Sequence, residues 1–180
     1  MDPSSRRFAQ PDARSCGASV LVMAQMLRNP AYAARLAGPD LWRAEVLAMH
    51  RRVTSSADVA GRLQAPWPRT LGTPPWAIAR QLQGTTGTPY RLGAIWPHRR
   101  AQALAEIRAA VRPGLPVPLY VGNRWLPRHV VLVLDAELTT YEPASGRYLR
   151  LEAERFVAGA VGLAGWQVPW FSVLPRRTPA

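Results

Sequence analysis

The sequence predicts an α+β fold, with helices in the first half of the chain and an antiparallel sheet in the second. Before Pro89, apolar residues recur mainly at helical spacing, whereas beyond it short runs of branched and aromatic residues alternate with turn signals. One longer helical pattern interrupts these strands, so the order is not the βαβ alternation of parallel sheets. The 180 residues, 48% of them hydrophobic, suit one domain. We expect it over residues 8–175, after a disordered lead-in at 1–7.

The most apolar helical segment runs from Cys16 to Leu27, after a turn-rich stretch at residues 8–15. Too few polar positions remain for a solvent-facing helix, so we expect it to be buried on most sides and ended by Asn29-Pro30. Further helices are expected at residues 31–38, 40–53, 56–63 and 76–82, with a Pro- and Gly-rich loop at 65–75 and a flexible break at 84–88.

The second half alternates strand and turn patterns. Strands are expected at residues 90–96, 117–121, 129–134, 139–141, 148–151 and 167–174, and helices at 99–111 and 151–157. A turn at 135–138 would join two of these strands as an antiparallel hairpin. The start of its first strand and the end of its second would then lie at the same end of the sheet.

The charge is strongly basic, at +12, and all 23 basic residues are arginine. The arginines are scattered, and no zinc-ligand spacing or RNA-binding signature accompanies them, so nucleic acid is not the expected partner. An acidic protein, such as an inhibitor or immunity protein, or an anionic surface would explain the charge as readily. No apolar run approaches the ~20 residues that span a bilayer, and no signal peptide is recognisable, so the compartment stays open.

One cysteine and three histidines are the residues that most often carry chemistry. A single cysteine excludes an internal disulfide, and the spacing of the four residues matches no standard metal site. We therefore expect neither a metal nor a cofactor. His50 and His98 lie among arginines or beside a proline and are expected to be solvated.

Cys16 is the candidate nucleophile because it lies where the turn-rich segment meets the buried helix. A helix N-terminus and a neighbouring imidazolium each lower a thiol's pKa. The backbone amide of Cys16 would be free to bind an oxyanion, and the side chain of Gln10 could supply a second donor. Gly17 would let a substrate carbonyl approach the backbone. The alternative is that the cysteine is a small buried hydrophobe.

His129 is the candidate base, since it begins an apolar strand and so suits the edge of a cleft. A catalytic base needs an acceptor that orients it. Glu142 follows the next strand, and the expected hairpin would bring it near His129. Asp135 and Asn123 are the alternatives for this third position.

Three motifs resemble those of papain-like cysteine peptidases, most closely the bacterial domains that process bacteriocin leaders. QPDARSCGAS resembles the family's Gln…Cys-Gly segment, RHVVLV its histidine strand, and YEPASG its acid-Pro…Gly turn. The resemblance covers residues 8–24 and 116–147 but not 30–110. It implies a papain-like fold, with the nucleophile helix packed on the sheet.

By that resemblance Gln10 would be the oxyanion residue, Cys16 the nucleophile, His129 the base and Glu142 the orienting acid. The family usually has Asp or Asn at the last position, so the glutamate is a departure. Trp76 in the Pro-rich region and Asn123 with Trp125 before the histidine strand could form the walls of a cleft for an extended substrate. The alternatives are a rigid packing loop and an ordinary β-turn.

We therefore expect a cysteine hydrolase that acts on peptide or amide bonds. The same residues on related folds perform glutamine deamidation or transglutamination in bacterial toxins and effectors, and acceptor choice depends on cleft shape. A non-catalytic binding module on this scaffold and a nucleic-acid binder are the further alternatives. The expected partner is a protein or peptide substrate.

Overall fold

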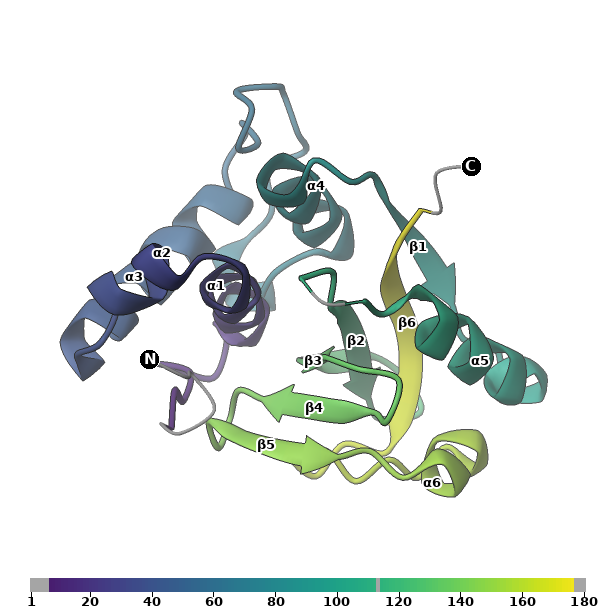
Figure 1. Cartoon of the computed structure of the whole chain (residues 1–180). Helices are drawn as coiled ribbons and strands as arrows, with labels where there is room; N and C mark the ends of the chain where they lie inside the picture. Colours follow the sequence, from purple (N-terminus) through teal and green to yellow (C-terminus); the bar gives the residue numbers. More distant parts are fainter. Residues whose placement is uncertain (1–6, 113, 177–180) are drawn as a thin grey trace.

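The computed structural model, which describes residues 7–112 and 114–176, has its helices concentrated in the N-terminal half and a six-stranded antiparallel sheet in the C-terminal half (Figure 1). The predicted α+β class is thus confirmed. The lead-in predicted at residues 1–7 lies outside the described residues except for Arg7, which is exposed.

The N-terminal helices largely follow the predicted pattern. They are α1 (Cys16–Arg28), α2 (Pro30–Arg35), α3 (Pro39–Val53) and α4 (Pro75–Thr86), with a 3₁₀ turn at Arg69–Leu71. Prolines occupy the first turn of α2, α3 and α4, where a missing N–H costs no helical bond. Cys16 is the first residue of α1 and most of that helix is buried, both as predicted.

Two local predictions are wrong. Residues 56–63 form no helix, because the carboxylate of Asp58 accepts the amides of Ala60 and Arg62, both at 2.9 Å, and closes a turn there. Such side-chain bonds to the backbone compete with helix formation. The break expected at 84–88 starts too early, since α4 continues until Gly87, whose left-handed φ of 71° ends it.

The strands lie in the order β1-β6-β2-β3-β4-β5. They are β1 (Tyr90–Ala94), β2 (Val117–Gly122), β3 (Pro127–Val133), β4 (Thr139–Glu142), β5 (Arg147–Arg150) and β6 (Val168–Pro175), with α5 (Arg100–Ala110), α6 (Ala153–Ala158) and a 3₁₀ turn at Pro97–Arg99 between them. Every pairing is antiparallel. All six predicted strands are present, with shifted ends.

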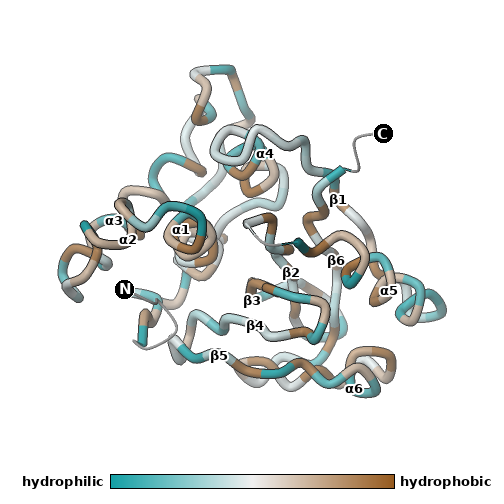
Figure 2. Tube along the Cα trace, in the orientation of Figure 1, coloured by the Kyte–Doolittle hydropathy of each residue, from teal (hydrophilic) through white to brown (hydrophobic). Residues whose placement is uncertain are grey.

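The sheet is covered on both faces. Val130 and Leu132 of β3 belong to the core shared with α1, whereas Val131 and Val133 belong to the core shared with α5 and α6. This alternation follows the period of two along a strand. The tube in Figure 2 is hydrophobic along much of α1 and β3. The start of α1 is therefore anchored in the core that contains the middle of β3.

The histidines outside β3 differ from each other. His98 is exposed as predicted, but His50 of α3 is buried, so the prediction of a solvated side chain there is wrong. Burial lowers the pKa of His50. His50 is buried although arginines follow it in the sequence, because it lies on the face of α3 that packs on the core. None of the helices in the described part of the chain is long and apolar enough to cross a membrane.

Candidate active site

Cys16 lies at an uncapped helix start. Ser15, at the N-cap position, makes no side-chain cap, and its hydroxyl donates instead to the Asp12 carbonyl at 3.3 Å. The first helical bond runs from the Ser19 amide to the Ser15 carbonyl, so the amides of Cys16 and Gly17 precede it. Free amides and the positive end of the helix dipole are therefore next to the thiol, which is 6% exposed.

Gln10 reaches the same helix start. Its side-chain Nε2 donates at 2.8 Å to the Asp12 carbonyl, which also accepts the Ser15 hydroxyl. The Gln10 amide and the Ser15 hydroxyl therefore share one acceptor, and Ser15 directly precedes Cys16 in the sequence. One of its two N–H groups makes this bond, and the second remains available as a donor.

Thr73 and Tyr120 also lie at the start of α1, and the sequence analysis missed both. A Cβ atom on Gly17 would lie 2.6 Å from the Thr73 Cβ, so this glycine permits the close approach of the loop before α4. The Tyr120 hydroxyl donates to the Thr73 carbonyl at 2.8 Å, and the charge of Cys16 acts on this phenol. No local pattern signals either residue, because the contacts join a loop, a helix and a strand.

His129 and Glu142 are in direct contact. His129 Nε2 lies 2.7 Å from Glu142 Oε1, and the two residues are 5% and 3% exposed. The hairpin explains this, since Leu132 of β3 pairs with Tyr141 of β4, and Glu142 and His129 both lie beyond this pair toward the same end of the sheet. The turn between β3 and β4 forms where it was predicted, with the Leu138 amide donating to the Asp135 carbonyl.

The turn after β4 holds the Glu142 carboxylate. The amides of Ala144 and Ser145 donate to it at 2.7 and 2.8 Å, and the Ser145 hydroxyl donates at 2.6 Å. Burial alone would raise the pKa of Glu142, but the bonds from His129, Ser145 and the two amides outweigh it and lower the pKa to about 2. Glu142 is therefore ionised at neutral pH. The role of Ser145 was missed, although its place three residues after the glutamate fits a side-chain-closed turn.

The His129 ring also contacts the thiol of Cys16. Burial alone would lower the pKa of His129, but hydrogen bonds with Cys16 and Glu142, and the charges of both, outweigh it and raise the pKa to about 9. Because Nε2 faces Glu142, Nδ1 is the ring nitrogen left for the thiol. The structure thus brings the sulfur, the imidazole and the carboxylate together, with the Gln10 amide nearby.

The two alternatives for the acid are used elsewhere. Asp135 lies in the turn beyond the other end of β3 and accepts the Thr139 amide at 2.8 Å. Asn123 closes the turn between β2 and β3, where its side chain accepts the amides of Trp125 and Leu126. Among Glu142, Asp135 and Asn123, only Glu142 contacts His129.

The proposed substrate walls differ in exposure. Trp125 is 68% exposed at the tip of the β2–β3 hairpin, with the Arg124 guanidinium 4.5 Å above its ring. Trp76 is half-buried and packs edge-on against Trp67 at 5.1 Å, so part of its surface serves packing. Asn123 is a turn former rather than an exposed contact. Trp125 is therefore the more accessible aromatic surface on the His129 side.

Glu142→Gln is expected to lower the pKa of His129, because the amide removes both the charge and the acceptor that help to raise it. Histidine C–H chemical shifts followed by NMR over a pH titration would measure the change. Asp135→Asn is the matched control, since that carboxylate lies at the far end of β3, and it should leave the His129 titration at about 9. Equal titrations in the wild type and Glu142→Gln would contradict the pairing.

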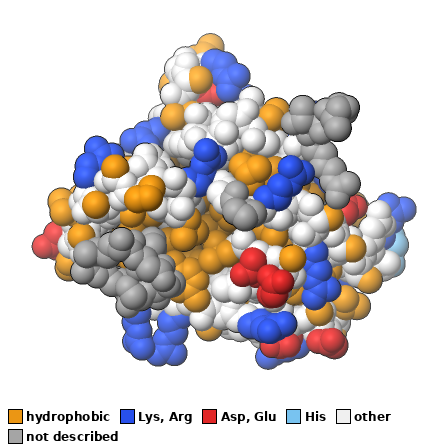
Figure 3. All heavy atoms as spheres, in the orientation of Figure 1, with side chains coloured by type: hydrophobic (Ala, Val, Ile, Leu, Met, Phe, Trp, Pro, Cys, Tyr) orange, Lys and Arg blue, Asp and Glu red, His pale blue; other side chains and the backbone are white. Residues whose placement is uncertain are grey.

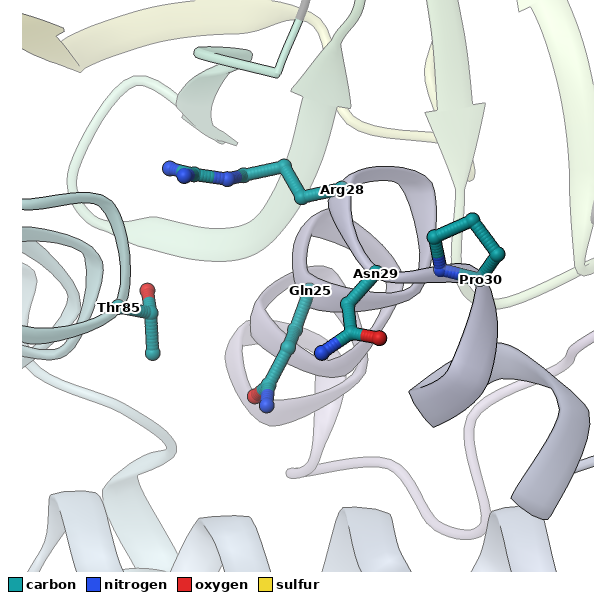
Figure 4. Close-up of a pocket in the computed structure, with 5 residues that line it drawn as sticks. All are labelled: Gln25, Arg28, Asn29, Pro30 and Thr85. Atoms are coloured by element: carbon teal, nitrogen blue, oxygen red, sulfur yellow. The ribbon is translucent and has the colours of Figure 1, made fainter.

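One pocket lies away from this pair. Figure 4 shows a pocket of about 320 Å³ lined by Gln25, Arg28, Asn29, Pro30 and Thr85. It is at the C-terminal end of α1, and a 13-residue helix is roughly 18 Å long, so the pocket is separate from Cys16. Within residues 7–112 and 114–176, no three His, Cys, Asp or Glu side chains are grouped so that they could hold a metal ion.

No family model matches the chain, and no curated protein matches it.

Proposed function

We propose that this chain is a papain-like cysteine hydrolase that cleaves amide bonds through Cys16, His129 and Glu142. The observation that carries the proposal is the placement of the His129 imidazole between the Cys16 thiol and the ionised Glu142 carboxylate. A nucleophile, a base and an orienting acid in hydrogen-bond contact define this class of catalyst on many folds. The order of helices and sheet is compatible with a papain-like fold.

In the proposed reaction, His129 takes the thiol proton and the sulfur attacks the carbonyl carbon to form a C–S bond. The oxyanion accepts hydrogen bonds from the Cys16 amide and the second N–H of Gln10. The C–N bond then breaks as His129 gives its proton to the leaving amine. Water, deprotonated by His129, releases the acid from the thioester and restores the thiol. Glu142 keeps the ring oriented throughout.

A peptide is the substrate that the surroundings favour. Trp125 offers an exposed ring on the His129 side, and the loop that carries Thr73 packs against Gly17 on the Cys16 side. An extended segment between them would meet aromatic and backbone surfaces, which suit peptide binding. Arginines are dispersed over the face in Figure 3, which does not favour a nucleic-acid stripe.

Glutamine deamidation or transglutamination is the second candidate, as in bacterial toxins and effectors that use such a triad. The observation that favours it is the low exposure of the reacting pair, 6% for Cys16 and 5% for His129. A narrow glutamine side chain reaches a recessed thiol more easily than a backbone carbonyl does. In this reaction the leaving group is ammonia, and water or an amine releases the acyl group.

Incubation with casein, followed by peptide mapping by mass spectrometry, separates the two candidates. Hydrolysis produces new chain ends, whereas deamidation converts Gln to Glu in an unbroken chain. The Cys16→Ala protein is the control for both. A binding module is the remaining explanation if neither product forms with the wild type, or if the variant forms the same products.

A further inference from the structure

Residues 8–10 form a short strap between the helical half and the sheet. On the sheet side, the Tyr141 hydroxyl donates to the Phe8 carbonyl, and the Gln10 amide donates to the Pro143 carbonyl at 2.7 Å. Both acceptor and donor groups of the strap backbone are thus bound to the end of β4 and the turn that follows it.

The helical half holds the same strap from α3. The Trp42 indole Nε1 donates to the Ala9 carbonyl at 2.7 Å, and the Phe8 ring packs on Trp42 with centroids 5.0 Å apart. Two successive carbonyls, those of Phe8 and Ala9, are therefore bound by side chains from two different layers of the fold.

Gly146 lets the strap lie directly on the turn that holds Glu142. A Cβ atom on Gly146 would lie 2.6 Å from the Ala9 nitrogen and 2.8 Å from the Phe8 nitrogen, and its φ of 65° favours glycine. No side chain can separate the two backbones here. The strap position is therefore set from three sides before the chain reaches Gln10.

We propose that Tyr141 and Trp42 are positioning residues that set the place of Gln10, the oxyanion donor, through the strap. The inference rests on the proposed function. An oxyanion donor must lie about 2.7–3.1 Å from the developing charge, and a misplacement of about 1 Å can cost on the order of 10²-fold in rate. The amide nitrogen of the Gln10 side chain is four bonds from its Cα, and Gln10 is itself the last residue of the strap, so a shift of the strap moves the amide as well.

Tyr141 is well suited to this role. It is fully buried, and burial and the charges of Tyr148 and Glu142 raise the pKa of its phenol well above the ordinary value. The hydroxyl therefore keeps its proton over the working pH range and always donates to the strap. Tyr141 also neighbours Glu142, so the test must separate an effect on Gln10 from an effect on the acid.

Tyr141→Phe removes this one bond and keeps the ring. We expect kcat for the best-cleaved casein peptide to fall about tenfold with an unchanged KM, because the donor acts on the transition state. Tyr32→Phe is the matched control: Tyr32 is also buried and loses a hydroxyl bond, but that bond runs to Glu45 of α3, at 2.8 Å, and not to the strap. That variant should keep the wild-type kcat. Trp42→Phe, which frees the Ala9 carbonyl, should resemble Tyr141→Phe.

Two further measurements locate the effect. In a Gln10→Ala background, Tyr141→Phe should cause no additional loss of kcat, since the donor that it positions is gone. The alkaline limb of the pH–rate profile, which reports the pKa of His129, should lie at the same pH in Tyr141→Phe as in the wild type. Equal kcat values for Tyr141→Phe and Tyr32→Phe would overturn the inference. It would also be overturned if Tyr141→Phe lowered kcat about tenfold in the Gln10→Ala background as well. An inactive wild type would instead contradict the proposed function.

Discussion

Cys16→Ala is expected to lower casein cleavage by about 10⁴-fold or more, to the uncatalysed background, because no other side chain in the site can form the thioester. The cysteine is the only one in the chain, so no second thiol can substitute for it. The fold should survive, since alanine fills most of the volume of a small buried side chain. Initial rates and a thermal unfolding curve would measure both effects.

Ser19→Ala is the matched control for this variant. Ser19 is one turn further along α1 and is fully buried, and no partner of its hydroxyl lies within the described residues. It should unfold at nearly the same temperature as the wild type and keep its activity. Casein cleavage that persists in Cys16→Ala would remove the thiol from the mechanism.

His129→Gln is expected to lower the rate by about 10³-fold or more, because the amide cannot accept the thiol proton or return one to the leaving amine. Glutamine is preferable to alanine, since its amide can still donate to Glu142. Removal of that donor would take one hydrogen bond from the buried, charged carboxylate of Glu142 and so destabilise the fold. His98→Gln, at an exposed histidine, is the control and should retain full activity.

The wild-type pH profile provides an independent check on His129. Its pKa is raised to about 9, so the imidazolium, which would protonate the leaving amine in the proposed reaction, persists to that pH. Activity should therefore fall as the pH rises through about 9, and Glu142→Gln should move this limb to lower pH. A limb that does not move in Glu142→Gln would show that another group controls it.

The sequence predicted the elements that depend on local pattern. The apolar run after Ser15 predicted where α1 begins, and the two strands on either side of residues 135–138 predicted the hairpin that joins His129 to Glu142. Both follow from period and spacing alone. The choice among Glu142, Asp135 and Asn123 needed the strand register. A one-residue slip in the pairing of β3 with β4 would have moved the Glu142 side chain to the other face of the sheet.

The remaining features depend on contacts between distant segments. Thr73 approaches Gly17 only because the loop before α4 folds over α1, and Tyr141 meets Phe8 across 133 residues of sequence. His50 is buried although arginines follow it, because the inner face of α3 packs on the core. Asp58 ended an expected helix through side-chain bonds that periodicity does not reveal.

The rate of alkylation of Cys16 by iodoacetamide tests the central claim most directly, because the single cysteine makes the label specific. At about pH 6, a free thiol with a pKa near 8.5 is almost entirely protonated and reacts slowly. If His129 takes up the thiol proton, the wild type should react about tenfold or more faster than free cysteine, and His129→Gln should lose this advantage. A wild type that reacts no faster than free cysteine, and no faster than His129→Gln, would contradict the account.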